Sequence, residues 1–308
     1  MSDVASGARR DNVGRGIALT LFAILIFSTQ DASSKFLVEG HSPFQITMMR
    51  FWGFGAFSLL LVLRQGPLRH AFRSSAPWLQ VSRGVLLVAD IWLFAIALRT
   101  VGLPELQAIT LVYPLLVTLV AIPVLGERVG LFRFAAVGVG FLGALVIVRP
   151  GGLPLDWGVA AGISSAACYA IYIVLTRKVS AADSTTTSMF YVGAVGLVLT
   201  SAVGVFYWSP LDTVSWLLVI YIMITSCVAH GIMMVALSIA PASVLQPFNY
   251  TSLPWSILFS YFVFQHLIDP TSLLGAAVIV GAGLVVMMRE RIRRVPAAAA
   301  EPALPGKE

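Results

Sequence analysis

An aspartate in the middle of a long apolar run is the most informative residue of this chain. Asp90 is flanked by Leu-Leu-Val-Ala on one side and Ile-Trp-Leu-Phe on the other, and Arg83 lies seven residues earlier, on the same helical face. If the run crosses a bilayer, each ionisable side chain costs about 2.5–3.5 kcal/mol. Two roles would justify that cost: an Asp90–Arg83 pair that joins two helices, or a carboxylate that binds a substrate amine or carries a coupling proton. The residue types leave both open.

Asp31, Lys35 and Arg50 form a second set of charges near the ends of two apolar runs. Asp31 and Lys35 are one helical turn apart and could pair, while Lys35 is also long enough to reach the membrane surface. Arg50 cannot lose its proton and needs a partner, for which Asp31 is the preferred candidate. We therefore expect a structural or gating ion pair here; a clamp for a substrate carboxylate is the alternative.

His230 is the remaining titratable side chain deep within an apolar run. A lone histidine in such a run is more often a hydrogen-bonded packing residue than a proton relay, but with an offset of 139 residues His230 aligns with Ile91, beside Asp90, which strengthens the case for a functional role. Gln246-Pro247 followed by Asn249 predicts a locally unwound helix with free carbonyls, and such breaks often form solute sites. The other binding candidates share a polar tip on a large apolar body or lie beside this break: Trp92, Tyr113, Tyr169, Tyr172 and Tyr250.

Several kinds of chemistry lack their motif. We find no His-Glu-x-x-His, no Gly-x-Ser-x-Gly, no pair of aspartates that we can assign to neighbouring helices, and no nucleotide-binding loop ending in Lys-Ser/Thr. Cys168 and Cys227 fall in apolar runs without metal-ligand spacing. We therefore expect no metal, no cofactor and no enzymatic activity, although an integral membrane enzyme is kept as an alternative of another class.

Composition then identifies the environment of these residues. Of the 308 residues, 58% are hydrophobic and 11% are charged, whereas soluble domains carry roughly 25% charged residues. We expect an all-α membrane protein, and ten apolar segments of spanning length can be marked. They lie near residues 15–37, 44–63, 78–98, 104–124, 131–148, 156–177, 187–207, 214–237, 241–264 and 271–289.

The basic residues predict the orientation of these segments. With the N-terminus in the cytoplasm, 15 Lys and Arg fall on the inner side and 3 on the outer side, while Arg50 and Arg83 lie within spans. The net charge of +6 therefore belongs to membrane topology and gives no support to nucleic-acid binding. We expect a multi-pass protein of the cell inner membrane with both termini cytoplasmic.

Internal repetition divides the chain into two halves. With an offset of 139, Ala97-Leu98 matches Ala236-Leu237, and residues 114–126 lie over residues 253–265. Because five spans are an odd number, the second half would enter the membrane from the opposite side, as in inverted-repeat carriers. The predicted division is a tail at 1–13, repeats at 14–150 and 151–290, and a disordered tail at 291–308. Glycines would let the fifth and tenth spans approach closely; they are Gly138, Gly140, Gly143, Gly275, Gly281 and Gly283.

Loose motifs over residues 14 to 290 give the chain a resemblance to a known family. It resembles EamA-type members of the drug/metabolite transporter superfamily, nearest to the S-adenosylmethionine-carrier-like and amino-acid exporter branches. The matching features are the 31–35 segment, Met49-Arg50-Phe51, Arg83-Gly84, Pro114, Gly126-Glu127-Arg128, residues 138–150, residues 246–250 and residues 275–283. One departure is that Gly126-Glu127 becomes Gln265-His266 in the second half, where the family often keeps Glu.

The resemblance implies ten helices in two inverted repeats with a substrate cavity between them at mid-membrane. The implied activity is secondary transport of a small organic solute by alternating access, preferably export of an amino acid or related metabolite. The alternative is an uptake carrier for a larger metabolite such as S-adenosylmethionine or riboflavin. The expected partners are this solute and the lipid bilayer, and the protein could be a monomer or a homodimer.

Overall fold

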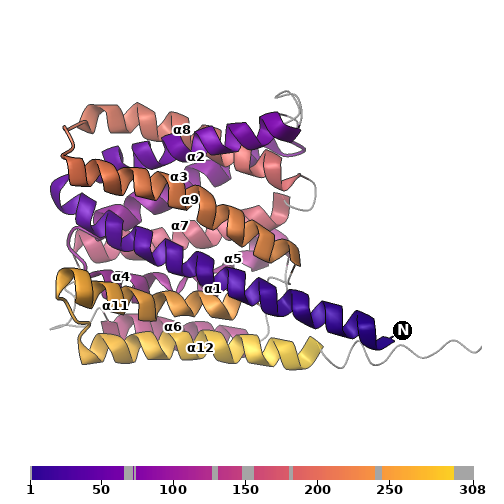
Figure 1. Ribbon diagram of the computed structural model, residues 1–308. Helices are drawn as coiled ribbons and strands as arrows, with labels where there is room; N and C mark the ends of the chain where they lie inside the picture. The colour runs from indigo at the N-terminus through magenta and orange to yellow at the C-terminus, as the bar shows by residue number, and fades with distance from the viewer. Residues whose placement is uncertain are drawn as a thin grey trace, which may run out of the picture.

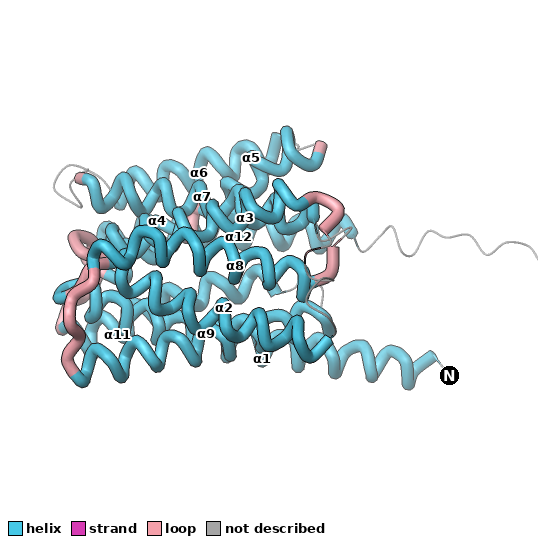
Figure 2. The backbone as a smooth tube through the Cα atoms, turned by 90° about the horizontal axis from the view of Figure 1, so that it is seen from above, coloured by secondary structure: helices cyan, strands magenta, loops and turns pink. Residues whose placement is uncertain are grey.

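The chain folds into a bundle of helices that run along a common direction, with the turns gathered at the two ends (Figures 1 and 2). The computed structural model describes residues 2–65, 72, 74–126, 131–147, 156–179, 183–239 and 245–294. Within these ranges the regular structure is entirely helical. The prediction of an all-α protein is therefore confirmed.

The helices follow one another with short connections. Their bounds are α1 Ser2–Gly40, α2 Pro43–Gln65, α3 Pro77–Ala97, α4 Leu103–Thr110, α5 Tyr113–Leu125, α6 Leu131–Ile147, α7 Trp157–Val179, α8 Thr185–Gly204, α9 Thr213–Ile239, α11 Ser252–Phe264 and α12 Pro270–Arg294, with 3₁₀ turns η2 Val205–Tyr207 and η3 Gln246–Thr251. Proline opens several of them, as expected for a residue whose fixed φ suits the first helical turn.

Seven helical stretches within the described residues are long and apolar enough to cross a membrane. They are Gly14–Gly40, Pro43–Gln65, Pro77–Ala97, Leu103–Leu125, Trp157–Val179, Thr185–Tyr207 and Thr213–Met233. Two shorter apolar helices, Phe134–Ile147 and Pro270–Val286, lie where the fifth and tenth spans were expected. The expected ninth span is represented by η3 and α11, and residues 240–244 before them lie outside the described residues.

The helices at the two ends of the chain are longer than predicted. α1 begins at Ser2, within the segment 1–13 expected to be a tail, and α12 continues to Arg294, into the segment 291–308 expected to be disordered. Neither extension contains a proline, so nothing in the backbone stops the helix there. Residues 295–308 lie outside the described part. The first turn of α1 and the last turn of α12 lie at the same end of the bundle (Figure 1).

Two helices break at equivalent places in the two halves of the chain. The fourth span divides into α4 and α5 at residues 111–112, and η3 passes into α11 at residues 251–252. α5 and α11 both have 13 residues and start 139 positions apart. Each ends on a left-handed residue, Gly126 with φ 68° and Gln265 with φ 53°. The predicted overlay of residues 114–126 on residues 253–265 is confirmed, including the left-handed residue at the end of each helix.

The main contacts between helices are equivalent when corresponding helices of the two halves are exchanged. α1 packs along α9 and α3 packs along α7, while α2 faces α8 and α6 faces α12. Exchanging α1 with α7 and α3 with α9 converts the first pair of contacts into the second. Each of these four contacts joins a helix of the first half to a helix of the second half.

Only some of the predicted glycines make the close approach between α6 and α12. A Cβ on Gly143 would lie 2.8 Å from the Gly275 carbonyl oxygen, and one on Gly275 would lie 2.6 Å from the Gly143 carbonyl oxygen. The added Cβ atoms of Gly140 and Gly283 would instead overlap Leu115 and Tyr250, whereas Gly138 and Gly281 face open space. The crossing is thus fixed by one backbone-to-backbone contact.

The two ends of the bundle carry different contacts, and we name them by their residues. At the Asp183 end, Asp183 accepts hydrogen bonds from Ser75 N at 2.8 Å, Gln80 Nε2 at 2.7 Å and the Ser74 hydroxyl. Burial raises the pKa of Asp183, but these hydrogen bonds outweigh it and lower the pKa to about 2. The segment before α3 is thereby tied to the segment before α8. We call the opposite end the Lys35 end.

We predict that Gly143→Ala or Gly275→Ala lowers the midpoint of thermal unfolding in detergent. Neither carbonyl can move without shifting its helix, and overpacking of this kind costs about 1–3 kcal/mol. Gly138→Ala and Gly281→Ala are the matched controls, since nothing lies within 4 Å of their added Cβ. An equal response of all four variants would contradict the assigned crossing.

Candidate functional site

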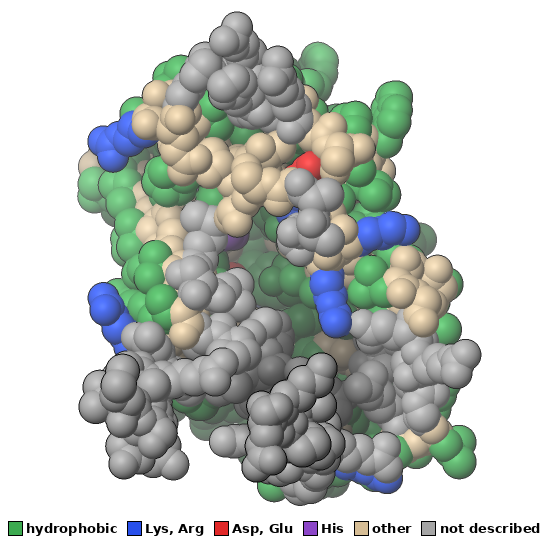
Figure 3. All heavy atoms as spheres, turned by 90° about the vertical axis from the view of Figure 1, so that its right-hand side faces the viewer, with side chains coloured by type: hydrophobic (Ala, Val, Ile, Leu, Met, Phe, Trp, Pro, Cys, Tyr) green, Lys and Arg blue, Asp and Glu red, His purple; other side chains and the backbone are tan. Residues whose placement is uncertain are grey.

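A cavity of about 260 Å³ lies between the helices of both halves. Its walls come from α1, α2, α3, α4, α5, α7, α9, η3 and α11, and at the Asp183 end the surface is hollowed between them, with hydrophobic walls and a histidine visible inside (Figure 3). The polar side chains that line it are Ser28, Asp31, Arg50, Asp90, Gln107, Thr110, Tyr113, Ser165, Tyr169, His230, Asn249 and Ser252.

Three charged residues meet at this cavity, which we call the three-charge cluster: Asp31, Arg50 and Asp90. Arg50 on α2 interacts electrostatically with Asp31 on α1 and with Asp90 on α3. Among the described residues no hydrogen bond or ion pair joins the guanidinium to either carboxylate. The expected Asp31–Arg50 partnership is therefore shared with Asp90, and all three groups keep hydrogen-bonding capacity that faces the cavity.

From the sequence we expected no paired aspartates on neighbouring helices within the membrane, and the structure shows that this was wrong. Asp31 and Asp90 are 59 positions apart in the sequence, but α1 and α3 are in contact and both carboxyls line one cavity. Their adjacency depends on tertiary packing, which no local spacing reveals.

Asp90 does not have the partner that its spacing suggested. The Ser165 hydroxyl on α7 donates to Asp90 Oδ1 at 2.5 Å, and the nearby cation is Arg50. Arg83 is turned to a different neighbour: its Nε donates to Thr176 Oγ1 at 2.9 Å, its Nη1 bonds Gln80, and the guanidinium lies 5.4 Å from the centre of the Tyr172 ring. The expected Asp90–Arg83 pair is thus wrong, because a seven-residue spacing separates the two Cα atoms by about 10 Å along a helix.

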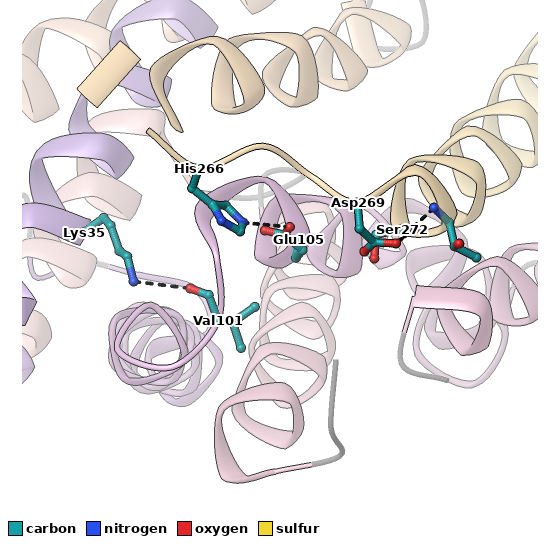
Figure 4. A network of polar contacts seen from close by, with 7 residues as sticks. Lys35, Val101, Glu105, His266, Asp269 and Ser272 are labelled. Carbon is teal, nitrogen blue, oxygen red and sulfur yellow. Dashed lines mark hydrogen bonds and ion pairs between the residues drawn. The ribbon is translucent and has the colours of Figure 1, made fainter. Parts of the chain in front are cut away.

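Lys35 lies at the opposite end of the bundle and does not pair with Asp31. Its Nζ donates to the Leu98 carbonyl at 2.5 Å and lies 3.5 Å from the Val101 carbonyl (Figure 4). These carbonyls follow the last turn of α3, where backbone oxygens have no helical donor. Its nearest acid is Glu39, at 3.8 Å and one turn further along α1. Sequence spacing could not distinguish this cap from an Asp31 pair or from the preferred expectation that Lys35 reaches the membrane surface.

His230 lies in the cavity, as its alignment beside Asp90 suggested. Its Nδ1–H donates to the Ser226 carbonyl at 2.8 Å, which directs the other ring nitrogen away from its own helix. The ring packs edge-on against Phe27 and Phe54 at centroid distances of 5.1 and 5.3 Å. A histidine held in this way can still accept or donate one hydrogen bond through Nε2.

The aromatic candidates divide into two groups. Tyr113 and Tyr169 line the cavity and pack edge to face at 4.9 Å. Tyr172 stacks behind Tyr169 at 5.8 Å and faces Arg83. Trp92 and Tyr250 do not line the cavity, and the Trp92 Nε1 and the Tyr250 hydroxyl are buried with no hydrogen-bond partner in the described part of the chain.

The break at η3 contributes polar atoms to the cavity. Gln107 Nε2 on α4 donates to Ser252 Oγ at 2.9 Å, and that hydroxyl donates to the Asn249 carbonyl at 2.8 Å. The predicted unwinding near Gln246 and Asn249 is confirmed as a 3₁₀ turn, although the side chain of Gln246 lies outside the described ones. Gln107, Thr110, Ser28 and Ser165 were missed from sequence. The 139-residue offset places Gln107 over Gln246 and was a usable signal for the first of them.

The arrangement is suited to binding and offers little for bond cleavage. A carboxylate-bearing solute could lie on Arg50, and a positive group could lie between Asp31 and Asp90. Among the described residues no group of three or more His, Cys, Asp or Glu side chains could hold a metal ion. Aromatic rings and small hydroxyls complete the walls, as is typical of small-molecule sites.

Comparison with known protein families gives two matches along the chain. The model of the EamA-like transporter family matches residues 14–149 and residues 156–288. One solved structure superposes with a TM-score of 0.64 at 20% identity, over 90% of this chain and 97% of that one. It supports the likeness of fold alone.

Among the relatives with assigned names, two kinds of transporter recur. The S-adenosylmethionine uptake transporter of Rickettsia prowazekii (strain Madrid E) is 24% identical over 276 residues, 90% of this chain and 93% of the relative. The riboflavin transporter of Rhizobium johnstonii is 28% identical over 257 residues, 80% of this chain and 83% of the relative. The chain is thus a multi-pass membrane protein similar to carriers of small organic molecules.

We predict that Asp90→Asn and Arg83→Gln have additive effects on the free energy of unfolding. Residues that share no partner add to within about 0.3–0.5 kcal/mol. Equilibrium unfolding in mixed micelles of both single variants and the double variant measures this. Asp90→Asn combined with Ser165→Ala is the positive control, since the hydroxyl donates directly to the carboxylate. Strong coupling between positions 83 and 90 would contradict the assigned partners.

Proposed function

The chain belongs to the EamA-like transporter family, and on this premise we propose that it carries an organic solute with a carboxylate and fixed positive charge, the class of S-adenosylmethionine. The single observation that carries this proposal is the three-charge cluster in the cavity wall. Arg50 would bind the carboxylate of the solute, and Asp31 and Asp90 would bind its positive groups.

Charge balance supports this class over neutral solutes. With both carboxyls ionised, the cluster carries one positive and two negative charges and lacks one positive charge. S-adenosylmethionine carries a carboxylate, an ammonium and a sulfonium group, and so brings one net positive charge. In a low-dielectric cavity an uncompensated charge is expensive, so a solute of complementary charge is favoured.

We propose a topology of ten membrane-crossing helices in two inverted repeats, residues 14–150 and 151–290, in the inner membrane with both termini cytoplasmic. The exchange of packing between α1–α9 and α7–α3 supports it, as do the matching breaks before α5 and α11. The start of α1 and the end of α12 lie at one end of the bundle (Figure 1), and the excess of basic residues favours that end as cytoplasmic.

With this orientation the cavity opens to the cytoplasm and is closed at the Lys35 end, as in the inward-facing state of an alternating-access carrier. The relatives are named for uptake of S-adenosylmethionine or for riboflavin, so they favour uptake of a larger metabolite over the expected export of an amino acid. Amino-acid transport draws its remaining support from the carboxylate-binding capacity of Arg50.

Riboflavin is the second candidate solute. Its flat ring system is uncharged and would depend on stacking, for which Tyr113 and Tyr169 offer faces within the cavity. The relative named for riboflavin shares 28% of aligned residues with this chain. This alternative leaves the three-charge cluster without a complementary partner, and we rank it second for that reason.

We predict that purified protein in proteoliposomes exchanges labelled S-adenosylmethionine, and that Arg50→Gln lowers kcat/KM by at least about tenfold. Loss of a hydrogen bond to a charged group in a buried site costs roughly 1.5–3 kcal/mol, which sets this magnitude. Asp90→Asn should weaken transport of the cation in the same way. Riboflavin flux should be unaffected by either substitution if it occurs at all.

Arg64→Gln is the matched control, because Arg64 is exposed in the last turn of the same helix. It should transport like the wild type. Flux of riboflavin with no flux of S-adenosylmethionine would move the assignment to the second candidate. Absence of flux for both solutes and for amino acids would overturn the proposal.

A further inference from the structure

An acid–histidine contact at the Lys35 end joins the two halves of the chain. Glu105 lies in the first turn of α4, and its Oε1 is 3.0 Å from Nε2 of His266, which follows α11 (Figure 4). The side chain of Glu105 is only 5% exposed, whereas that of His266 is 49% exposed. A nearly buried carboxylate is thus covered by a residue at the surface.

The surroundings leave Glu105 few other partners. Its Oε2 is buried and has no hydrogen-bond partner among the described residues. Gly102 lies directly against the contact: an added Cβ would overlap Glu105 Oε2 and come within 2.8 Å of His266 Nε2. The backbone between α3 and α4 therefore closes over the carboxylate on one side, and His266 closes over it on the other.

His266 directly follows the left-handed residue that ends α11. Gln265 adopts the left-handed conformation, as Gly126 does in the first half, and the His266 amide then bonds the Ser260 carbonyl at 3.2 Å. The turn directs the imidazole back over α4. A histidine at this place can donate a hydrogen bond from Nε2 to the Glu105 carboxylate.

Other contacts at this end also include ones that cross the halves, since His41 and Gln45 bond Ser209 before α9, but some stay within one half. Lys35 binds the carbonyls of Leu98 and Val101, and Arg99 Nε donates to the Val38 carbonyl at 3.1 Å. These contacts hold α1 against the end of α3, within the first half. On α12, Asp269 accepts the Ser272 amide at 3.0 Å and caps its own helix. The Glu105–His266 contact instead ties α4 to the end of α11, two helices that both line the cavity.

We propose that Glu105 and His266 form the latch that closes the solute pathway at the Lys35 end and must part for the carrier to open on that side. The proposal rests on the proposed transport function. If the two side chains separate, the Glu105 carboxylate loses its hydrogen bond to His266. The latch can therefore open only when water hydrates this carboxylate. The pair therefore determines the balance between the two access states and takes no part in holding the solute.

Hydrogen–deuterium exchange of the full chain in lipid nanodiscs tests the latch without any solute. In Glu105→Gln and in His266→Gln, amides of residues 98–106 and 264–272 should exchange faster by about tenfold, because a hydrogen bond to a charged group is lost. Amides of residues 74–80 and 183–188, at the Asp183 end, should exchange more slowly as that end closes. Opposite changes at the two ends are the signature of a shifted access state.

Glu39→Gln is the matched control, because Glu39 lies at the same end and, among the described residues, its ion pair is with Lys35 of the same helix. This variant should leave amide exchange at both ends as in the wild type. The exchanged pair Glu105→His with His266→Glu should restore the wild-type pattern. Faster exchange at both ends, an unchanged pattern, or an equal effect of Glu39→Gln would overturn the latch. A solute-free readout also keeps this result separate from the proposed function, which fails only if no solute is transported.

Discussion

The guanidinium of Arg50 cannot lose its positive charge in the wall of a cavity between helices, and this imposes a constraint on the helices around it. α1 and α3 must each bring a carboxylate toward α2, which places Asp31 and Asp90 on one cavity wall. α7 must then approach α3 closely enough for Ser165 to donate to Asp90. α1 and α7 are corresponding helices of the two halves, as are α3 and α9. The electrostatic requirement of Arg50 is therefore coupled to the packing of both halves.

The other buried charges serve the frame around this cluster. Arg83 ties α3 to α7 through Thr176, and Lys35 caps the carbonyls that follow α3. α6 and α12 cross through Gly143 and Gly275, and neither helix lines the cavity. On the proposed transport function, the closely packed α6–α12 pair beside the cavity, the Glu105–His266 contact at one end and the hollow at the other would serve alternating access. The charged residues that line the cavity and those that hold the surrounding helices together are thus different residues.

Local patterns predicted the helices, the break near Gln246 and the 139-residue overlay of α5 on α11, because hydropathy and backbone conformation depend on neighbouring residues. The interaction partners of the charged side chains could not be predicted from local patterns. The seven-residue spacing suggested an Asp90–Arg83 pair, but a long arginine side chain reached across to α7 instead. The one-turn spacing of Asp31 and Lys35 was equally compatible with a pair, yet the orphan carbonyls at the end of α3 attracted Lys35. Contact between α1 and α3 could not be read from either segment alone.

The central claim is that Arg50 binds a carboxylate of the solute while the two aspartates bind its positive groups. Isothermal calorimetry on wild type and Arg50→Gln, each with S-adenosylmethionine and with its decarboxylated analogue, tests it most directly. We expect the Kd of the wild type to rise at least about tenfold when the carboxylate is removed, and Arg50→Gln to bind both ligands equally. The same preference for the carboxylate in both proteins would contradict it.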